Sequence, residues 1–118
     1  MKTACFTGNR LISWDTKIIQ NLYSFLNEII CSGVLNFYAG GALGWDMICE
    51  NAVIKLREKH PIIKLHLILP CPPEEQTLKW TTTQKREFNR ILDLADNVEI
   101  ISEHYLNGCF RLRNIRLV

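Results

Sequence analysis

The stretch FYAGGALGWD, residues 37–46, joins an apolar run to a helical pattern through glycines. The run Leu35–Ala39 predicts a buried strand, and apolar residues recur at helical spacing from Gly44 to Lys59. Glycines at such a junction let a ligand approach the backbone, and the N–H groups that begin the helix suit a phosphate. The same glycines also fit a tight turn with close helix packing, so this stretch alone leaves both interpretations open.

The alternation of strand and helix extends over the whole chain. Short apolar runs predict three more strands, at Thr3–Thr7, Ile62–Leu69 and Val98–Ser102. Helical spacing of apolar residues predicts the remaining helices, at Asp15–Cys31, Glu74–Trp80, Thr81–Ala95 and from about Asn107 to the end. Gly33 marks the end of the first helix, and Thr81 and Gln84 have the spacing of a capping box.

This alternation with short connections is typical of an α/β fold with a parallel sheet. We expect residues 1–118 to form a single domain, a Rossmann-like three-layer sandwich with about four strands and helices on both faces. The favoured strand order is 3-2-1-4, by analogy with doubly wound sheets. The fourth strand is then an edge, which the last helix covers or a second copy of the chain pairs with.

Composition narrows the classes of function. The chain has 47% hydrophobic and 22% charged residues and a net charge of +2, which are ordinary values for one globular domain. So small a net charge argues against nucleic acid and membrane partners. The five cysteines form no CxxC pair and no signal peptide precedes them, so we expect a cytoplasmic protein without a metal site.

Candidate binding residues follow the predicted strands, because ligands of open parallel sheets bind at the carboxyl ends of the strands. The segments at this edge are Thr7–Arg10, Gly40–Asp46, Pro70–Cys71 with Gln76 and Trp80, and Ser102–Tyr105. His66 lies in the middle of a predicted strand, where a structural role is the usual one.

Several of these side chains have two interpretations. Arg10 is either a phosphate ligand or a solvated surface residue, and Thr7 is either a ligand or a strand terminus. Asp46 favours the N-terminal end of the helix dipole, or it holds a ribose hydroxyl. Glu50 is either a general acid or a solvent-facing residue, and Trp80 either stacks on a base or belongs to the core or a lid.

Four motifs in order resemble the YpsA-like branch of the SLOG superfamily, which also contains the DNA-processing protein DprA and the lonely-guy phosphoribohydrolases. The motifs are Thr7-Gly8-Asn9-Arg10, Gly40-Gly41-Ala42-Leu43-Gly44-Trp45-Asp46, Pro70-Cys71 with Gln76 and Trp80, and Arg113-Asn114. The resemblance implies a bacterial protein with a Rossmann-like fold, a glycine-rich nucleotide pocket and no required cofactor. The implied ligand-binding residues are Thr7, Gly8, Asn9, Arg10, Gly40, Gly41, Ala42, Gly44, Asp46, Pro70, Gln76, Trp80, Arg113 and Asn114.

The chain departs from the family pattern in three respects. Asn9 stands where the family often has histidine, and an amide cannot shuttle a proton. The lonely-guy Pro-Gly-Gly-x-Gly-Thr-x-x-Glu motif is not matched, and Glu50 is only a distant counterpart of its glutamate. The family's last strand and helix are missing after Arg113-Asn114, so we expect a truncated member whose pocket is incomplete or is completed in a homodimer.

These observations favour a nucleotide-binding sensor or regulatory protein rather than an enzyme. One alternative is a lonely-guy-like nucleoside-monophosphate phosphoribohydrolase in which Asp46 or Glu50 assists departure of the base. A second alternative is DprA-like binding of single-stranded DNA, which requires a basic groove and stacking aromatic residues.

Overall fold

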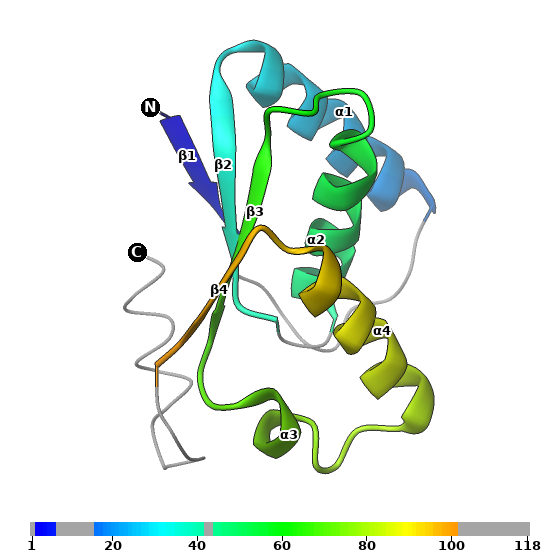
Figure 1. Cartoon of the computed structure of the whole chain (residues 1–118). Helices are drawn as coiled ribbons and strands as arrows, with labels where there is room; N and C mark the ends of the chain where they lie inside the picture. Colours follow the sequence, from blue (N-terminus) through cyan, green and yellow to red (C-terminus); the bar gives the residue numbers. More distant parts are fainter. Residues whose placement is uncertain (1, 7–15, 42–43, 102–118) are drawn as a thin grey trace.

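The computed structural model describes residues 2–6, 16–41 and 44–101 (Figure 1). Strands and helices alternate along these residues as the sequence predicts. The strands are β1 (Lys2–Cys5), β2 (Val34–Ala39), β3 (Lys64–Leu69) and β4 (Asn97–Ile100). The helices are α1 (Thr16–Cys31), α2 (Trp45–Leu56), α3 (Pro73–Gln76) and α4 (Thr82–Leu94).

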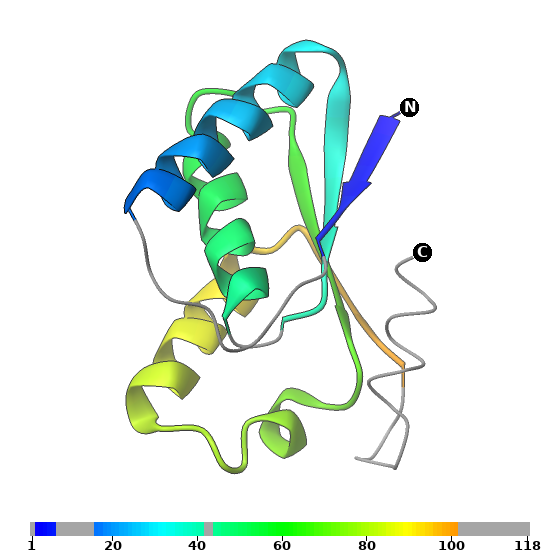
Figure 2. The same cartoon turned by 180° about the vertical axis from the view of Figure 1, so that it is seen from behind.

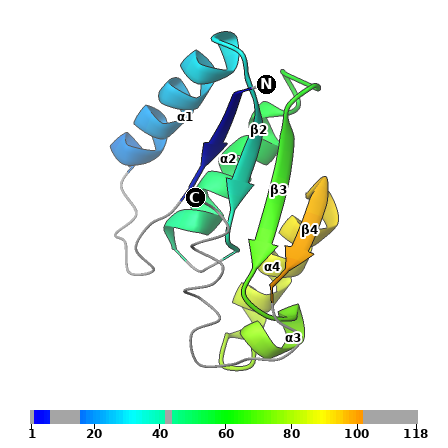
Figure 3. The same ribbon diagram turned by 90° about the vertical axis from the view of Figure 1, so that its left-hand side faces the viewer.

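The four strands form one parallel sheet in the order β1-β2-β3-β4, which is plain in Figure 3. The parallel α/β fold is confirmed, but the expected order 3-2-1-4 is wrong, because β4 pairs with β3 and not with β1. Asp96 holds β4 in this place: its backbone N–H donates to the carbonyl of Leu65 (2.8 Å), and its carboxylate accepts from the N–H of Leu65 (2.8 Å).

The helices α1, α2 and α4 all cover the same face of the sheet (Figures 1 and 2). Right-handed crossovers that all proceed in the same direction along a sheet place their helices on one side, so this arrangement follows from the strand order. The second layer of helices that the sequence predicts is not found among the described residues.

The two faces of the sheet differ in chemistry because side chains alternate along each strand. The covered face carries apolar side chains that form the core with α1, α2 and α4, among them Phe37, Leu65 and Leu67, which are at most 1% exposed. The opposite face, here called the open face, carries Asn36, Tyr38, His66, Asn97 and Glu99 on β2, β3 and β4. The sheet is therefore amphipathic.

The positions where the helices begin and end are explained by residues close to each end. Gly33 ends α1 with a φ of 107°, and Thr81 and Gln84 form both hydrogen bonds of the predicted capping box at the start of α4. The helix α2 ends at Leu56, earlier than the predicted Lys59, because the backbone tightens there into turns such as Glu58 N to Lys55 O (3.2 Å).

The helix α3 is also shorter than predicted. It ends at Gln76, and the chain continues in turns that include a hydrogen bond from Trp80 N to Thr77 O (3.0 Å). Within the described part of the chain, no helix has the length and apolar character needed to cross a membrane.

Candidate functional site

The glycine turn, here meaning Gly40, Gly41 and Gly44, lies at the carboxyl edge of the sheet between β2 and α2 (Figure 1). Gly41 and Gly44 have φ angles of 72° and 86°, a region that favours glycine. At Gly41 a side chain would also lack space, since a Cβ atom would lie 2.6 Å from Leu69 Cδ2 and 3.1 Å from Phe88 Cε1. Gly41 is therefore required both by its backbone conformation and by its packing.

Two buried side chains bind the backbone of Gly41. The N–H of Gly41 donates to Glu50 Oε2 (3.2 Å), and Gln76 Nε2 donates to the carbonyl oxygen of Gly41 (3.1 Å). Glu50 is 0% exposed and Gln76 is 8% exposed. Both polar backbone groups of Gly41 are thus bound within the protein, and its N–H is used up, so any backbone N–H offered to a ligand has to come from neighbouring residues.

The first turn of α2 follows the glycine turn directly. Gly44 is the N-cap residue and has no side chain with which to cap the helix, and the first helical hydrogen bond to it comes from Ile48 N (3.2 Å). The N–H groups of the first turn have no partner one turn earlier in the helix, and the helix dipole is positive at this end. Asp46 lies in this turn and is only 4% exposed.

Other predicted site residues at this edge are buried or pack against the core. Pro70 and Cys71 are fully buried at the end of β3. Trp80 packs edge-on against Phe88, with 5.2 Å between the ring centroids. Of the two interpretations of Trp80, its contact with the core is observed; stacking on a base stays a prediction.

The remaining predicted site residues lie outside the described residues. They are Thr7, Gly8, Asn9, Arg10, Ala42, Arg113 and Asn114, together with the segment Ser102–Tyr105. Their proposed roles rest on the sequence.

The buried cysteine of α2 is not an activated thiol. Burial raises the pKa of Cys49, and the carboxylates of Asp46 and Glu50 raise it further. A thiol acts as a nucleophile through its thiolate form, so Cys49 is inert at neutral pH. Among the described residues, no three or more histidine, cysteine or acidic side chains are grouped in a way that could hold a metal ion.

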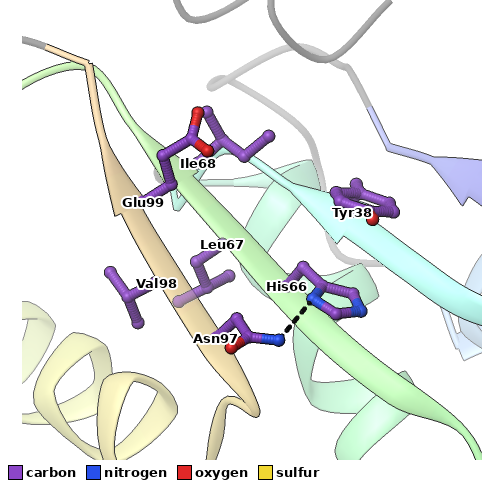
Figure 4. A pocket seen from close by; sticks show the side chains of 7 residues that line it. All are labelled: Tyr38, His66, Leu67, Ile68, Asn97, Val98 and Glu99. Carbon is purple, nitrogen blue, oxygen red and sulfur yellow. Dashed lines mark hydrogen bonds between the residues drawn. The ribbon is translucent and has the colours of Figure 1, made fainter.

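A hollow of about 410 Å³ on the open face was not expected from the sequence; it is lined by residues of β2, β3 and β4 (Figure 4). Asn97 Nδ2 donates to His66 Nδ1 (3.0 Å), and His66 Nε2 lies 2.8 Å from Asn36 Oδ1. These partners require a neutral imidazole with its proton on Nε2. Tyr38 stacks on His66 with 4.6 Å between the ring centroids. The sequence signal was the polar residue at alternate positions of β2 and β4, namely Asn36, Tyr38, Asn97 and Glu99.

Comparison with known proteins supports the predicted family. The family model YpsA, described as the YspA SLOG family, matches residues 14–116. The chain is 34% identical over 96 residues to the uncharacterized SPbeta prophage-derived protein YoqJ of Bacillus subtilis, with 78% of this chain covered. It is 33% identical over 85 residues to a UPF0398 protein of Halalkalibacterium halodurans, with 72% of this chain covered. The chain spans 55% and 44% of the lengths of these two relatives.

Among solved structures, the fold is similar to DNA processing protein A from Helicobacter pylori, whose structure is described as showing a unique mode of single-stranded DNA binding. The TM-score is 0.60 at 21% identity, covering 98% of this chain and 48% of that protein. At this identity the likeness shows a shared fold. Because the family model matches residues 14–116, most of the chain, this chain belongs to the YspA SLOG family.

Proposed function

We propose that this protein binds a nucleotide or nucleotide-derived ligand at the glycine turn and the first turn of α2, as a sensor or regulatory protein without robust catalysis. The observation that carries the proposal is the fixed backbone of Gly41, which Glu50 and Gln76 hold four residues before the first residue of α2. A rigid glycine turn that leads into a helix N-terminus is a favourable arrangement for a phosphate group.

The ligand contacts that we propose come from residues after Gly41. Its own N–H is taken by Glu50, so a phosphate would bind the N–H groups at the start of α2. The family resemblance implies a role for Arg10 and Arg113 in ligand binding, and we propose that they supply the positive charge that a phosphate requires.

Two features favour binding over catalysis. Glu50, the distant counterpart of the lonely-guy glutamate, is 0% exposed and is bound to a backbone N–H. A general acid must reach the atom that it protonates, and this carboxyl group is turned toward the protein. Asp46 is 4% exposed in the first turn of α2, where it has little surface to offer a leaving base.

The proposal is tested by native mass spectrometry of the purified chain, followed by calorimetric titration with nucleoside mono-, di- and triphosphates and a single-stranded oligonucleotide. We expect a nucleotide-sized adduct or a nucleotide dissociation constant, and no release of free base from AMP. The adduct would also reveal whether a homodimer carries the ligand. Tight, salt-dependent binding of the oligonucleotide without any nucleotide binding would contradict the proposal and favour a DprA-like role.

A matched pair of glycine variants locates the site. Gly44→Ala strains the N-cap of α2, whereas Gly33→Ala strains a turn at the far end of α1 that has nothing within 4 Å of the added Cβ atom. Both positions have a positive φ, so both variants bear a backbone penalty. We expect Gly44→Ala alone to weaken nucleotide binding; equal affinities in the two variants would contradict the assignment.

A further inference from the structure

We propose that Glu50 and Gln76 are positioning residues: they fix the backbone of Gly41 relative to the start of α2, where the ligand site is proposed. This inference rests on the proposed function, because it assigns a task to two buried side chains of that site. Neither residue is required to touch the ligand. The acidity of Glu50 is not required either, since only its acceptor oxygen takes part.

The position of Glu50 on α2 explains how it reaches the turn. Side chains of a helix point back toward its N-terminus, and Glu50 lies between one and two turns after the first residue of α2. Its carboxyl group therefore reaches the backbone that precedes the helix and accepts from Gly41 N at 3.2 Å. A buried carboxyl group has a high cost unless it is hydrogen-bonded, so this contact holds the two groups together.

Gln76 approaches the backbone of the same residue, Gly41, from a different element. It is the last residue of α3, which follows β3, and its amide donates to the carbonyl oxygen of Gly41 at 3.1 Å. Gly41 is thus held at its N–H by a side chain of α2 and at its carbonyl oxygen by a side chain of α3. Leu69 and Phe88 fill the space where a side chain of residue 41 would stand, so apolar packing closes the remaining side.

One conservative substitution, Glu50→Gln, distinguishes a positioning role of Glu50 from a catalytic one. Glu50→Gln keeps an acceptor oxygen at nearly the same place but removes the acid. If Glu50 positions the turn, Glu50→Gln retains the Gly41 contact and ligand binding, whereas Glu50→Met loses both. If Glu50 is a general acid, Glu50→Gln abolishes release of free base from AMP.

The experiment uses the full chain labelled with ¹⁵N-glycine, which gives at most six backbone amide signals because the sequence has six glycines. Hydrogen exchange of the Gly41 amide reports the contact with Glu50 directly, and titration with AMP and with inorganic phosphate reports binding. We expect Glu50→Met to speed exchange of Gly41 by about tenfold or more, the factor that corresponds to loss of one net hydrogen bond, and Glu50→Gln to stay near wild type.

Gln76→Met and Gln76→Glu test the carbonyl side. The first removes the donor, and the second places an acceptor oxygen opposite the Gly41 carbonyl, so we expect both to weaken AMP binding by about tenfold. The matched controls are Glu28→Met and Gln20→Met, which make the same kinds of change at exposed positions of α1 and should alter neither readout. If Glu50→Met fails to fold, Glu50→Gln and Gln76→Met still test whether Glu50 and Gln76 position Gly41.

The outcomes distinguish this inference from the proposed function. Unchanged Gly41 exchange and AMP affinity in both Glu50→Met and Gln76→Met overturn the positioning role. Glu50→Gln that keeps Gly41 protected but loses AMP affinity overturns it as well, because acidity would then matter. If wild type binds neither probe while Gly41 exchange responds as expected, the positioning role is supported and the proposed ligand is wrong.

Discussion

Gly41 lies where several elements meet, and its environment explains why this one residue is so constrained. Glu50 of α2 and Gln76 of α3 bind its backbone, and Leu69 of β3 and Phe88 of α4 occupy the space around its Cα atom. The sequence predicted the need for glycine from the junction of a strand and a helix. It could not predict the partners, because they lie 9 and 35 residues away and depend on how the helices pack.

Glu50 shows the limit of sequence reasoning at the level of single residues. An acidic residue on a helix is usually solvent-facing, and the apolar spacing of α2 did not place Glu50 on its buried face. In the structure α2 is covered on most sides, so that Asp46, Met47, Ile48, Cys49 and Glu50 are all buried. When a helix is buried all round, its periodicity no longer tells the inner face from the outer one.

Replacement of Gly41 by alanine should destabilise the protein more than replacement of Gly33. Both have a positive φ, which costs alanine about 1–2 kcal/mol, but only Gly41 also lacks space for a methyl group. Crowding adds about 1–3 kcal/mol at a well-packed position. Urea unfolding of Gly41→Ala and Gly33→Ala measures the difference, and equal losses of unfolding free energy would show that Leu69 and Phe88 yield without cost.

His66 should make the protein less stable as the pH falls. Burial lowers the pKa of His66 below the ordinary histidine value of 6.5, and Lys64 lowers it further, while Asp96 acts in the opposite direction. The unfolded chain therefore binds a proton more readily than the folded one, so the unfolding free energy falls as the pH drops through about 6.5 toward the lower folded pKa.

The variant His66→Asn removes this titration. We expect a smaller loss of unfolding free energy between about pH 7 and pH 5 than in wild type, measured by urea unfolding across that range. An identical pH dependence in both proteins would mean that the hydrogen bonds to Asn36 and Asn97 do not hold the imidazole in its neutral form.

At the scale of elements, some helix ends could be predicted from neighbouring residues, whereas the position of β4 in the sheet could not, because it depends on contacts between distant residues. The end of α1 at Gly33 and the capping box of α4 followed from residues within one turn of each other. The place of β4 depends on Arg57, whose guanidinium donates to Asp96 (2.7 Å) and to the carbonyl of Leu94 (2.8 Å). These partners are 37 to 39 residues apart, and no sequence pattern links them.

Loss of Asp96 should loosen β4 and lower the stability of the protein. Its carboxylate pairs with Arg57 and accepts from Leu65 N, so Asp96→Ala removes charge-assisted contacts worth about 1.5–3 kcal/mol. The control Glu87→Ala breaks a more exposed pair with Arg90 and should cost less than about 1 kcal/mol. Similar losses of unfolding free energy in the two variants would argue against a special role of Asp96 in placing β4.

For the whole molecule, the sequence predicted a parallel α/β sheet but neither the strand order nor the distribution of the helices. Handedness rules fix the sense of each crossover, yet they leave open on which side of the sheet the next strand is added. The strands proceed in one direction, so α1, α2 and α4 gather on one face of the sheet (Figure 3). Polar side chains of β2, β3 and β4 line the other face. Two surfaces therefore compete as ligand sites, the glycine turn and the hollow on the open face.

The measurement that separates these surfaces is an NMR titration of the uniformly ¹⁵N-labelled chain with AMP, following every backbone amide. We predict that the largest shifts occur at Gly41, Gly44 and Trp45, near the N-terminus of α2. Shifts concentrated at Tyr38, His66 and Asn97, or no shift at saturating AMP, would contradict the assignment of the glycine turn as the nucleotide site.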